Sequence, residues 1–521
     1  MRRDNRGSER YTLPIETLER RVLASQAPWS PAMLEAEAHT GAALVQNLGG
    51  PVNPAPHVAA AAHARPSAAS QLNLDFPTFV KMVKPLRNGL GTNAPMVLWG
   101  WPGPPANMSL DAFVQAYAAR GIIPQIPVGP GYNPVNTIAF AKALEAANMP
   151  VYLVFPKNDL LMMAYQNATI YTTYTDSSGT VYKYPCAPLI DASIGAAWVQ
   201  AQLAPLQDAG IHVTGVVFDD ENLPIPIDPG EYQSQKDDPT CASYYPPGAL
   251  DTFENFIQYI YQLRSTLEGQ IMADPVQQMF PGAVVGDFGA YQSSAAVPYV
   301  DVGGNAYPPR QSVDTNMLVP ALYNQAIPLA PPKSPAKATQ KWADDIFFTR
   351  WLQTLSTAAV NRGDNQIFSF VSSNIPGFWN VGNLKPLMSR NAYREALRHL
   401  WLRGTNSLWL FAGGGGLGTT AGAFQMMDDS RAVYDGLLAY RNFLSQGTPM
   451  NVTPPDPSGT QPIWSGLKLG DQALVRTYSP SGKAGRVTIE AFPGVSVKLP
   501  APAAGAGFLI TSTGHVRRVK M

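Results

Sequence analysis

Three consecutive acidic residues at the end of an apolar run are the strongest candidates for chemistry in this sequence. Asp219, Asp220 and Glu221 end a strand-like run that begins at Val213. Because successive side chains of a strand point to opposite faces, Asp219 and Glu221 share one face and Asp220 points to the other. Two carboxyl groups whose backbones lie about 7 Å apart can serve as an acid and its electrostatic partner. The run therefore predicts a site for acid–base chemistry.

Further polar and aromatic residues stand at the ends of other strand-like runs. Acids ringed by indole and phenol groups suit a sugar site, because carboxyl groups cleave glycosidic bonds and flat rings stack on pyranose faces. We predict catalytic roles for Glu221, Asp219 and Asp287, and Tyr307 ends the predicted sixth strand. We predict substrate contacts for Trp99, Trp101, Asp220, Tyr291, Asn305 and Asn374. Cleavage of a poly- or oligosaccharide is the expected activity.

The elements that must position these residues alternate between strand-like and helical patterns. Eight strands, each followed by a helix or a long loop, predict an α/β fold of the (β/α)8 TIM-barrel type, whose active sites lie at the carboxyl ends of the strands. A doubly wound open sheet is the alternative, because one sequence does not reveal strand order. The predicted strands are 96–101, 122–128, 151–155, 213–219, 283–288, 300–307, 367–371 and 407–411. The predicted helices are 109–120, 135–148, 196–209, 250–267, 342–361, 391–403 and 431–445.

Composition divides the chain into three predicted parts. Residues 1–72 are rich in Arg, Ala and Pro and bury too little apolar area to offset their ordering entropy, so we expect a disordered or export segment. Residues 73–448 form the predicted catalytic barrel. Residues 449–521 follow a Pro-rich linker and alternate with period two, which predicts a small antiparallel, sandwich-like β domain.

The spacing Gly215-x-x-x-Asp219-x-Glu221 resembles the strand-four motif of chitinase-type glycoside hydrolases of the TIM-barrel superfamily. Its Asp-x-Glu ending also resembles that of hyaluronidases. The resemblance implies that Glu221 protonates the glycosidic oxygen, that Asp219 orients a substrate acetamido group acting as nucleophile, and that Tyr307 assists.

The sequence departs from both patterns at three positions. Chitinase-type enzymes carry two further acids where Thr214 and Val217 stand, and hyaluronidases carry an aromatic residue where Asp220 stands. A second mechanism, with protein carboxylates alone, would pair Asp219 or Glu221 with Asp287. A carboxyl separation of about 5–5.5 Å would then indicate retention and about 6.5–9.5 Å inversion.

Two other functions remain open alternatives. A carbohydrate-binding barrel of the cell surface could carry the same aromatic residues without catalysis. A barrel lyase or isomerase acting on a phosphorylated metabolite would need cations after strands seven and eight, and only Arg431 is near the eighth. Neither metal-ligand spacing nor a cofactor motif is present, so neither group is predicted. Asp428 and Asp429 precede the last predicted helix and are expected to cap it.

The charge balance and the two cysteines limit which partners and which cellular compartment we expect. The 37 basic residues balance the 37 acidic ones, which gives no indication of a nucleic-acid partner. We expect no transmembrane segment, because no apolar stretch reaches 18 residues. Cys186 and Cys241 either form one disulfide between two loops or are two unpaired thiols. Residues 16–25 resemble the Leu-Glu-x-Arg-x-Leu export segment of some bacterial secreted or cell-surface proteins, which implies that location.

Overall fold

The computed structural model describes most of the region from residue 76 to the C-terminus. The described residues are 76–99, 103–129, 131–155, 168–175, 179, 181–218, 229–287, 299–300, 306–307, 317–318, 344, 348–349, 351–352, 355–356, 359, 365–371, 388–411, 420–453, 455, 461–480 and 482–521. Residues 1–72, predicted to be disordered, lie outside them.

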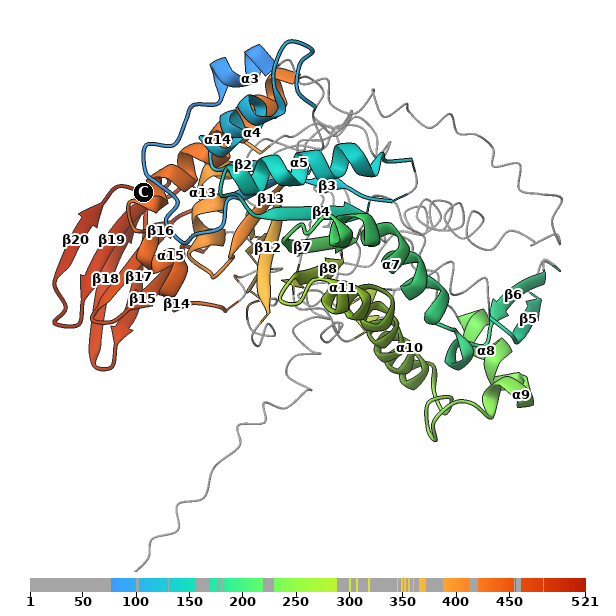
Figure 1. Cartoon of the computed structure of the whole chain (residues 1–521). Coiled ribbons are helices and arrows are strands. Elements are labelled where there is room, and N and C mark those ends of the chain that lie inside the picture. Colours follow the sequence, from blue (N-terminus) through green and yellow to red (C-terminus); the bar gives the residue numbers. More distant parts are fainter. Residues whose placement is uncertain are drawn as a thin grey trace, which may run out of the picture.

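A closed ring of parallel strands forms the centre of the molecule (Figure 1). One sheet has the order β11-β12-β13-β1-β2 and another the order β3-β4-β7-β8. The sheets join because only Gln125 separates β2 from β3 and because β8 lies beside β11. The bounds are β1 Met96–Trp99, β2 Ile122–Pro124, β3 Ile126–Pro127, β4 Val151–Phe155, β7 Val213–Phe218, β8 Val284–Asp287, β11 Met317–Leu318, β12 Gln366–Val371 and β13 Ser407–Phe411. Counting β2 and β3 as one, the described residues supply eight barrel strands, so the predicted (β/α)8 fold is confirmed.

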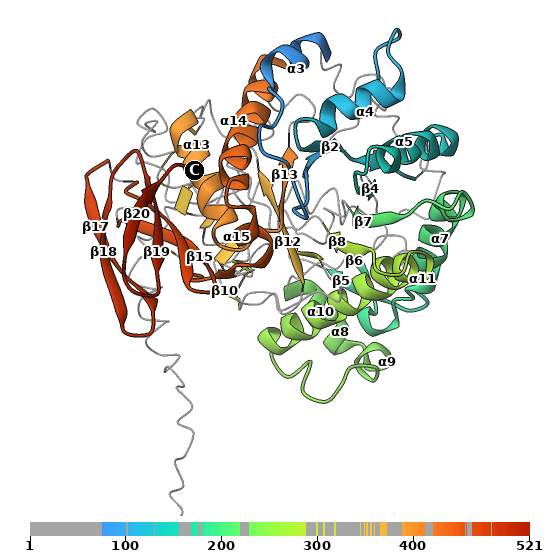
Figure 2. The ribbon, with the colours of Figure 1, turned by 60° about the vertical axis from the view of Figure 1, so that its left-hand side comes forward.

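Helices surround the ring on its outer side, which Figure 2 shows from a second direction. Ser109 caps the first of them after β1 through a bond from the Ala112 backbone N–H, as its residue type predicts. The bounds are α3 Phe76–Met82, α4 Leu110–Ala118, α5 Pro134–Ala146, α7 Ser193–Asp208, α10 Phe253–Glu268, η3 Gly269–Ala273, α11 Asp274–Met279, α13 Arg390–Trp401, α14 Thr420–Leu438 and α15 Arg441–Gln446.

The predicted sixth strand, 300–307, is wrong. The ends of that range instead belong to an antiparallel pair, β9 (Tyr299–Val300) with β10 (Ala306–Tyr307). The sixth barrel strand is β11, which pairs in parallel with β12. Val300, Val302 and Tyr307 are residue types that suit any strand, and β-propensity does not specify the partner.

The predicted last helix of the barrel, 431–445, is also wrong in its bounds. Helix α14 begins eleven residues earlier, at Thr420, and α15 is a separate helix. Asp428 and Asp429 are therefore inside a helix and do not cap its start. The Gly-rich run before Thr420 concealed the true beginning.

Aromatic side chains fill the barrel interior. The Trp409 ring lies edge-on to those of Tyr152 and Phe368, at centroid distances of 6.1 and 5.9 Å. Tyr152 comes from β4 and the other two from β13 and β12, so the three rings meet across the ring of strands. The barrel is thus a packed core and not a pore, as expected when strands are buried on both faces.

Gly215 on β7 provides the space that this packing needs. A Cβ atom there would come within 2.8 Å of the Tyr152 ring and of Val284. The same contacts show that Gly215 faces the barrel interior, beside Tyr152. Because side chains alternate, Val217 also faces inward and Phe218 faces the helices.

A separate antiparallel sheet of order β14-β15-β16-β19-β20 forms the C-terminal region (Figure 1). It covers the hairpin of β17 with β18, and buried residues such as Val475, Ile489 and Phe508 form a small core between these two layers. Alternate residues of β17 are buried, so the period-two pattern predicted a two-layer β region correctly. The bounds are β14 Thr448–Pro449, β15 Ile463–Leu469, β16 Gln472–Tyr478, β17 Gly485–Phe492, β18 Val495–Ala501, β19 Ala506–Thr511 and β20 Val516–Val519.

Candidate functional site

The carboxyl ends of three neighbouring strands lie level with one another. Phe155, Phe218 and Asp287 occupy equivalent positions at the ends of β4, β7 and β8. The Phe155 and Phe218 rings stack at 4.7 Å, and the Phe155 ring also lies 5.7 Å from that of Trp198 on α7. This aromatic contact on the helix side anchors the strand ends from which the predicted acids follow.

Most of the predicted site residues lie outside the described residues. These are Asp219, Asp220, Glu221, Trp101, Tyr291, Asn305 and Asn374. Only the backbones of Asp287 and Tyr307 are described. Asp287 is the last residue of β8, and Tyr307 belongs to β10, opposite Tyr299 and outside the ring of barrel strands. The prediction that placed Tyr307 on the sixth barrel strand is therefore wrong, while its proposed chemical role stays a prediction.

Trp99 lies in the barrel interior at the end of β1. Its ring contacts those of Phe370, Trp409 and Phe411 at centroid distances of 5.6 to 6.4 Å. Only 8% of the residue is exposed, so most of the indole belongs to the core. Any substrate contact by Trp99 would involve the small exposed part of the ring.

Gln125 is a polar residue that the sequence analysis did not single out. It lies between β2 and β3 and is 1% exposed, and its Oε1 accepts a hydrogen bond of 3.0 Å from Trp409 Nε1. That bond fixes the orientation of the amide, and Nε2 finds no hydrogen-bond partner among the described residues. A buried donor without a partner costs about 1–3 kcal/mol. In the sequence, Gln125 could have been recognised as the single amide residue inside the apolar run 122–128.

Two insertions that follow the carboxyl ends of β4 and β7 pack together into what we call the insertion lobe. The first contributes the hairpin of β5 (Tyr171–Thr175) and β6 (Val181–Pro185), with the short helix η2 (Ala187–Leu189). The second contributes α8 (Pro229–Asp237) and α9 (Pro239–Ala242), and Figure 1 shows the two side by side. The Thr172 and Ser234 hydroxyl oxygens, 2.9 Å apart, connect β5 to α8.

A disulfide between Cys186 and Cys241 joins the two insertions, with Cα atoms 5.6 Å apart. Of the two alternatives that the sequence left open, the structure has the bridge. Both cysteines are fully buried. Beside them the Tyr245 hydroxyl and the Glu231 carboxylate bind opposite ends of the Gln235 amide. Burial raises the pKa of Tyr245 above its ordinary value, and the nearby Glu231 raises it further.

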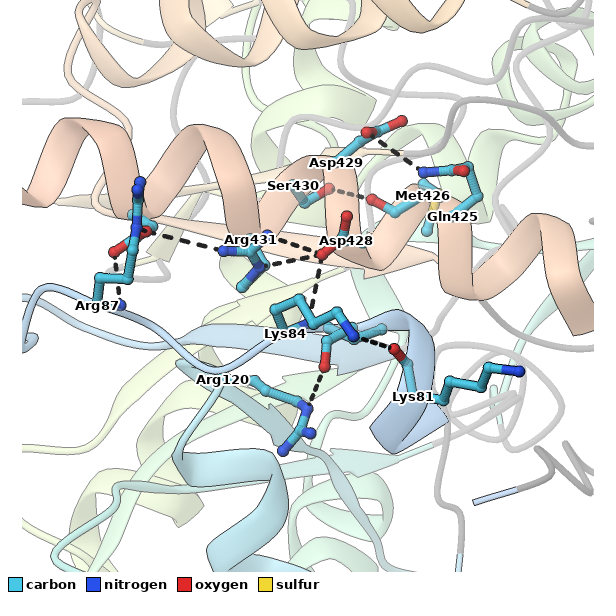
Figure 3. Close-up of polar contacts among 12 residues, drawn as sticks. Lys81, Lys84, Arg87, Arg120, Gln425, Met426, Asp428, Asp429, Ser430 and Arg431 are labelled. Atoms are coloured by element: carbon cyan, nitrogen blue, oxygen red, sulfur yellow. Dashed lines mark hydrogen bonds and ion pairs between the residues drawn. The ribbon is translucent and has the colours of Figure 1, made fainter. Parts of the chain in front are cut away.

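Charged groups are concentrated elsewhere, where α14 meets the segment that leads into β1 (Figure 3). Asp435 is buried and accepts hydrogen bonds from the backbone N–H groups of Arg87 and Asn88, both at 2.9 Å. The Arg87 side chain adds a bond of 2.7 Å. Burial alone would raise the pKa of Asp435, but these donors outweigh it and lower that pKa below its ordinary value. This cluster is structural, because it lies on the helix layer and not at the strand ends.

Asp428 and Asp429 extend the cluster toward α13. Asp428 pairs with Arg431 at 2.8 Å and accepts a weaker bond from the Lys84 backbone N–H (Figure 3). Asp429 accepts a bond of 2.6 Å from Arg390. These acids thus neutralise cations from neighbouring elements, which explains why they stand inside the helix.

Metal-binding groups and membrane-spanning helices are both absent from the part of the chain that the structure describes. No group of three or more His, Cys, Asp or Glu side chains that could hold a metal ion occurs in that part of the chain. Within the same residues, no helix is both long enough and apolar enough to span a membrane.

Comparisons with known proteins do not assign this chain to a family. No protein-family model and no curated protein matches the chain. Eubacterium rectale Amy13B aligns with 82% of this chain and 99% of its own, at 8% identity and a TM-score of 0.39. Isomaltulose synthase from Klebsiella sp. LX3 aligns with 85% and 94%, at 11% identity and a TM-score of 0.37. The α-amylase of Geobacillus thermoleovorans aligns with 75% and 81%, at 9% identity and a TM-score of 0.35. These values are too low to assign the chain to a family.

Proposed function

We propose that this chain is a glycoside hydrolase that cleaves glycosidic bonds in a poly- or oligosaccharide, with Glu221 as its general acid. The observation that carries the proposal is the inward direction of Gly215 and Val217 on β7. Asp219 and Glu221 lie outside the described residues, and from the same alternation we expect both to face the mouth of the barrel. Catalytic residues of barrels with this architecture lie at the carboxyl ends of the strands.

Asp219 is the partner that this register supports better than Asp287. The backbone of Asp287 is level with Phe218, which faces the helices. Asp219 is the residue after Phe218, so strand alternation predicts that it faces inward. We propose that Asp219 stabilises the charge that develops at the substrate while Glu221 donates its proton. Whether the nucleophile is a protein carboxylate or an acetamido group of the substrate is a separate question, which the nature of the cleaved sugar would answer.

The aromatic ends of two neighbouring strands support a sugar as ligand. Trp99 ends β1 and the half-buried Phe411 ends β13, and their ring centroids lie 6.3 Å apart. The exposed parts of these rings offer flat apolar surface to the face of a pyranose ring.

The test is sugar release from a panel of α- and β-linked glucans, galactosides, fucosides and N-acetylated polymers. Loss of a general acid typically lowers a rate by about 10²- to 10⁴-fold. We expect that loss in Glu221→Gln, with binding of the cleaved glycan retained. Asp208→Asn is the matched control, because Asp208 is exposed at the end of α7, ahead of β7 and at the opposite end of the strand.

Two outcomes would overturn the proposal in different ways. Release by Glu221→Gln at the wild-type rate would remove Glu221 from the mechanism. Binding of a glycan by the wild type without any release would instead support the carbohydrate-binding barrel.

We also propose that the protein acts outside the cytosol, in a secreted or cell-surface location. The Cys186–Cys241 disulfide supports this, because such bonds persist mainly in oxidising compartments. Fractionation of the producing cells with an antibody to the chain tests the location. Recovery in the cytosolic fraction with both thiols reduced would contradict it.

A further inference from the structure

The contact between α13 and the C-terminal sheet contains a buried polar cluster that the proposed catalysis does not use. Helix α13 and the turn after it face β15 and β16, and the views in Figures 1 and 2 agree on this arrangement. We call this contact the C-terminal interface. Its charged and polar side chains are Glu395, Arg398, His399 and Arg403 on the barrel side and Ser465 and Arg476 on the sheet side.

Arg403 places a buried positive charge in this interface. Its Nε donates to Ser465 Oγ at 2.8 Å, and its Nη1 donates to Ser356 Oγ at 2.6 Å and to the Thr453 carbonyl at 2.8 Å. These acceptors are neutral. Burial lowers the pKa of Arg403 to about 9, so the guanidinium is still charged at neutral pH.

His399 shares Ser465 with that guanidinium. The imidazole is fully buried, and its Nδ1 lies 2.8 Å from Ser465 Oγ. Because Ser465 Oγ already accepts the Arg403 N–H, the serine hydroxyl is available to donate to Nδ1. This arrangement suits the neutral imidazole that carries its proton on Nε2. Nε2 has no hydrogen-bond partner among the described residues.

Three arginines around His399 oppose a positive charge on it. Its own helix brings Arg398, the following turn brings Arg403, and β16 brings Arg476. The same helix also brings Glu395, the partner of Arg398, and β16 brings the Tyr478 ring. Phe348, which has helical backbone and precedes β12 in the chain, lies edge-on to the imidazole at a centroid distance of 5.3 Å.

The one acidic side chain of the cluster is already in use. Glu395 accepts from Arg476 Nε at 2.8 Å and from Arg398 Nη1 at 2.6 Å. Gly505, at φ +67°, lets this pair approach, because a Cβ there would collide with both side chains. Arg398 Nε also donates to the main-chain oxygen of Met521 at 3.1 Å, so that oxygen too is bonded to an arginine. A protonated imidazole would therefore add a buried cation beside three arginines.

We propose that His399 is an acid-sensitive latch, whose protonation releases the C-terminal sheet from α13. Burial, and then Arg403, Arg476 and Arg398, lower the pKa of His399 well below its ordinary value of 6.5. A base whose folded pKa is lowered stabilises the docked state above its unfolded pKa, and this contribution is lost as the pH falls below that value. Opening of the interface is thus coupled to uptake of one proton.

Hydrogen exchange of the full chain tests the latch at pH 8 and pH 5, after correction for intrinsic exchange rates. One histidine with an unfolded pKa near 6.5 increases the opening equilibrium by up to about 30-fold over this range. We expect that increase in peptides from α13 and β15, and little change in β1 and β13. Equal protection of the interface peptides at both pH values would overturn the proposal.

Substitution separates His399 from other titrating groups. In His399→Gln the glutamine can still bond to Ser465 but does not take up a proton, so the pH dependence of exchange should vanish. His515→Gln is the matched control, because His515 is exposed in the same C-terminal region and should leave the pH dependence intact. An unchanged pH dependence in His399→Gln would contradict the latch.

A measurement on the wild type covers the case in which His399→Gln does not fold. In protein labelled with ¹⁵N-histidine, we expect the His399 signals to show one neutral tautomer, protonated on Nε2, for as long as the interface is closed. As the pH is lowered, these signals should disappear over the same pH range in which the interface peptides lose their protection from hydrogen exchange. Titration of His399 near 6.5 with the interface still protected would rule the latch out.

Discussion

The insertion lobe and the C-terminal interface are held together by opposite physical means. Within the lobe, the Cys186–Cys241 bond joins the two insertions, with the neutral amide of Gln235 beside it. At the interface, buried charges join α13 to the C-terminal sheet, with Glu395 between two arginines. A covalent bond is indifferent to moderate acid, and an ion pair is indifferent to reductant. The two regions should therefore open under different conditions.

The disulfide and the ion pair also differ in whether they act on the unfolded chain or on the folded one. A disulfide stabilises mainly by restricting the unfolded chain. A buried ion pair acts in the folded state, where its attraction offsets the cost of removing two charges from water. Its presence is weak evidence for net stability, whereas loss of one partner is costly because the other charge stays buried.

The largest effect is expected from breaking the ion pair. Glu395→Ala would leave the Arg476 guanidinium, which is 8% exposed, without its carboxylate. Such a loss costs about 3–5 kcal/mol in the free energy of unfolding. Urea unfolding at pH 8 measures it. Glu490→Ala, at an exposed position of β17, is the control and should change that free energy by less than about 0.5 kcal/mol.

Removal of the disulfide should have the next largest effect. The bridge joins residues 55 positions apart, and loss of such a bond costs about 2–4 kcal/mol. Cys186→Ala/Cys241→Ala should lose protection from hydrogen exchange in β5, β6, α8 and α9 while the C-terminal interface keeps its own. Reductant should add nothing to the double variant. Equal loss of protection in both regions would show that the two attachments are not independent.

A smaller effect is expected at Asp435, which provides a second acid-sensitive contact for comparison with His399. Asp435→Asn keeps the side-chain shape but presents an N–H to donors on Arg87 and Asn88, at a cost of about 1–3 kcal/mol. The pKa of Asp435 is lowered from 3.8, so its contribution is complete above that value and is lost as the pH falls through the folded pKa.

The contact of Asp435 should thus fail only in strong acid, well below the range in which the latch opens. The free energy of unfolding, measured between pH 8 and pH 2, shows whether the latch opens at a higher pH than the one at which the Asp435 contact is lost. Loss of the Asp435 contribution above pH 5 would contradict it, and Asp435→Asn should flatten only the part of the curve below about pH 4.

The barrel strands were predictable because they are buried on both faces. The runs 151–155 and 407–411 match β4 and β13 at both ends, since such runs are continuously apolar. The prediction of 300–307 as a barrel strand failed because composition indicates a strand but does not reveal which strand it pairs with. Met317–Leu318, only two residues long, carries too little pattern to be recognised.

The candidate site was predictable only as a position in the chain. The end of β7 follows from the run 213–218, and its alternation is regular enough to separate Asp219 from Asp220. Gln125 was not predicted, and the sequence left open whether Trp99 or Trp101 packs in the core. Both outcomes depend on Trp409, about 284 residues from Gln125 and about 310 from Trp99 in the sequence. Contacts at such separations leave no local periodicity.

The sequence by itself determined seven of the eight barrel strands, the positions in the chain at which acids follow them, and the antiparallel β structure of the C-terminal region. These properties rest on local alternation and burial, which a single chain displays along its length. Only the tertiary structure decided that β11 completes the ring, that Cys186 meets Cys241, and that His399 lies among arginines. The physical reason is that each depends on groups far apart in the chain, which are brought together when the barrel closes.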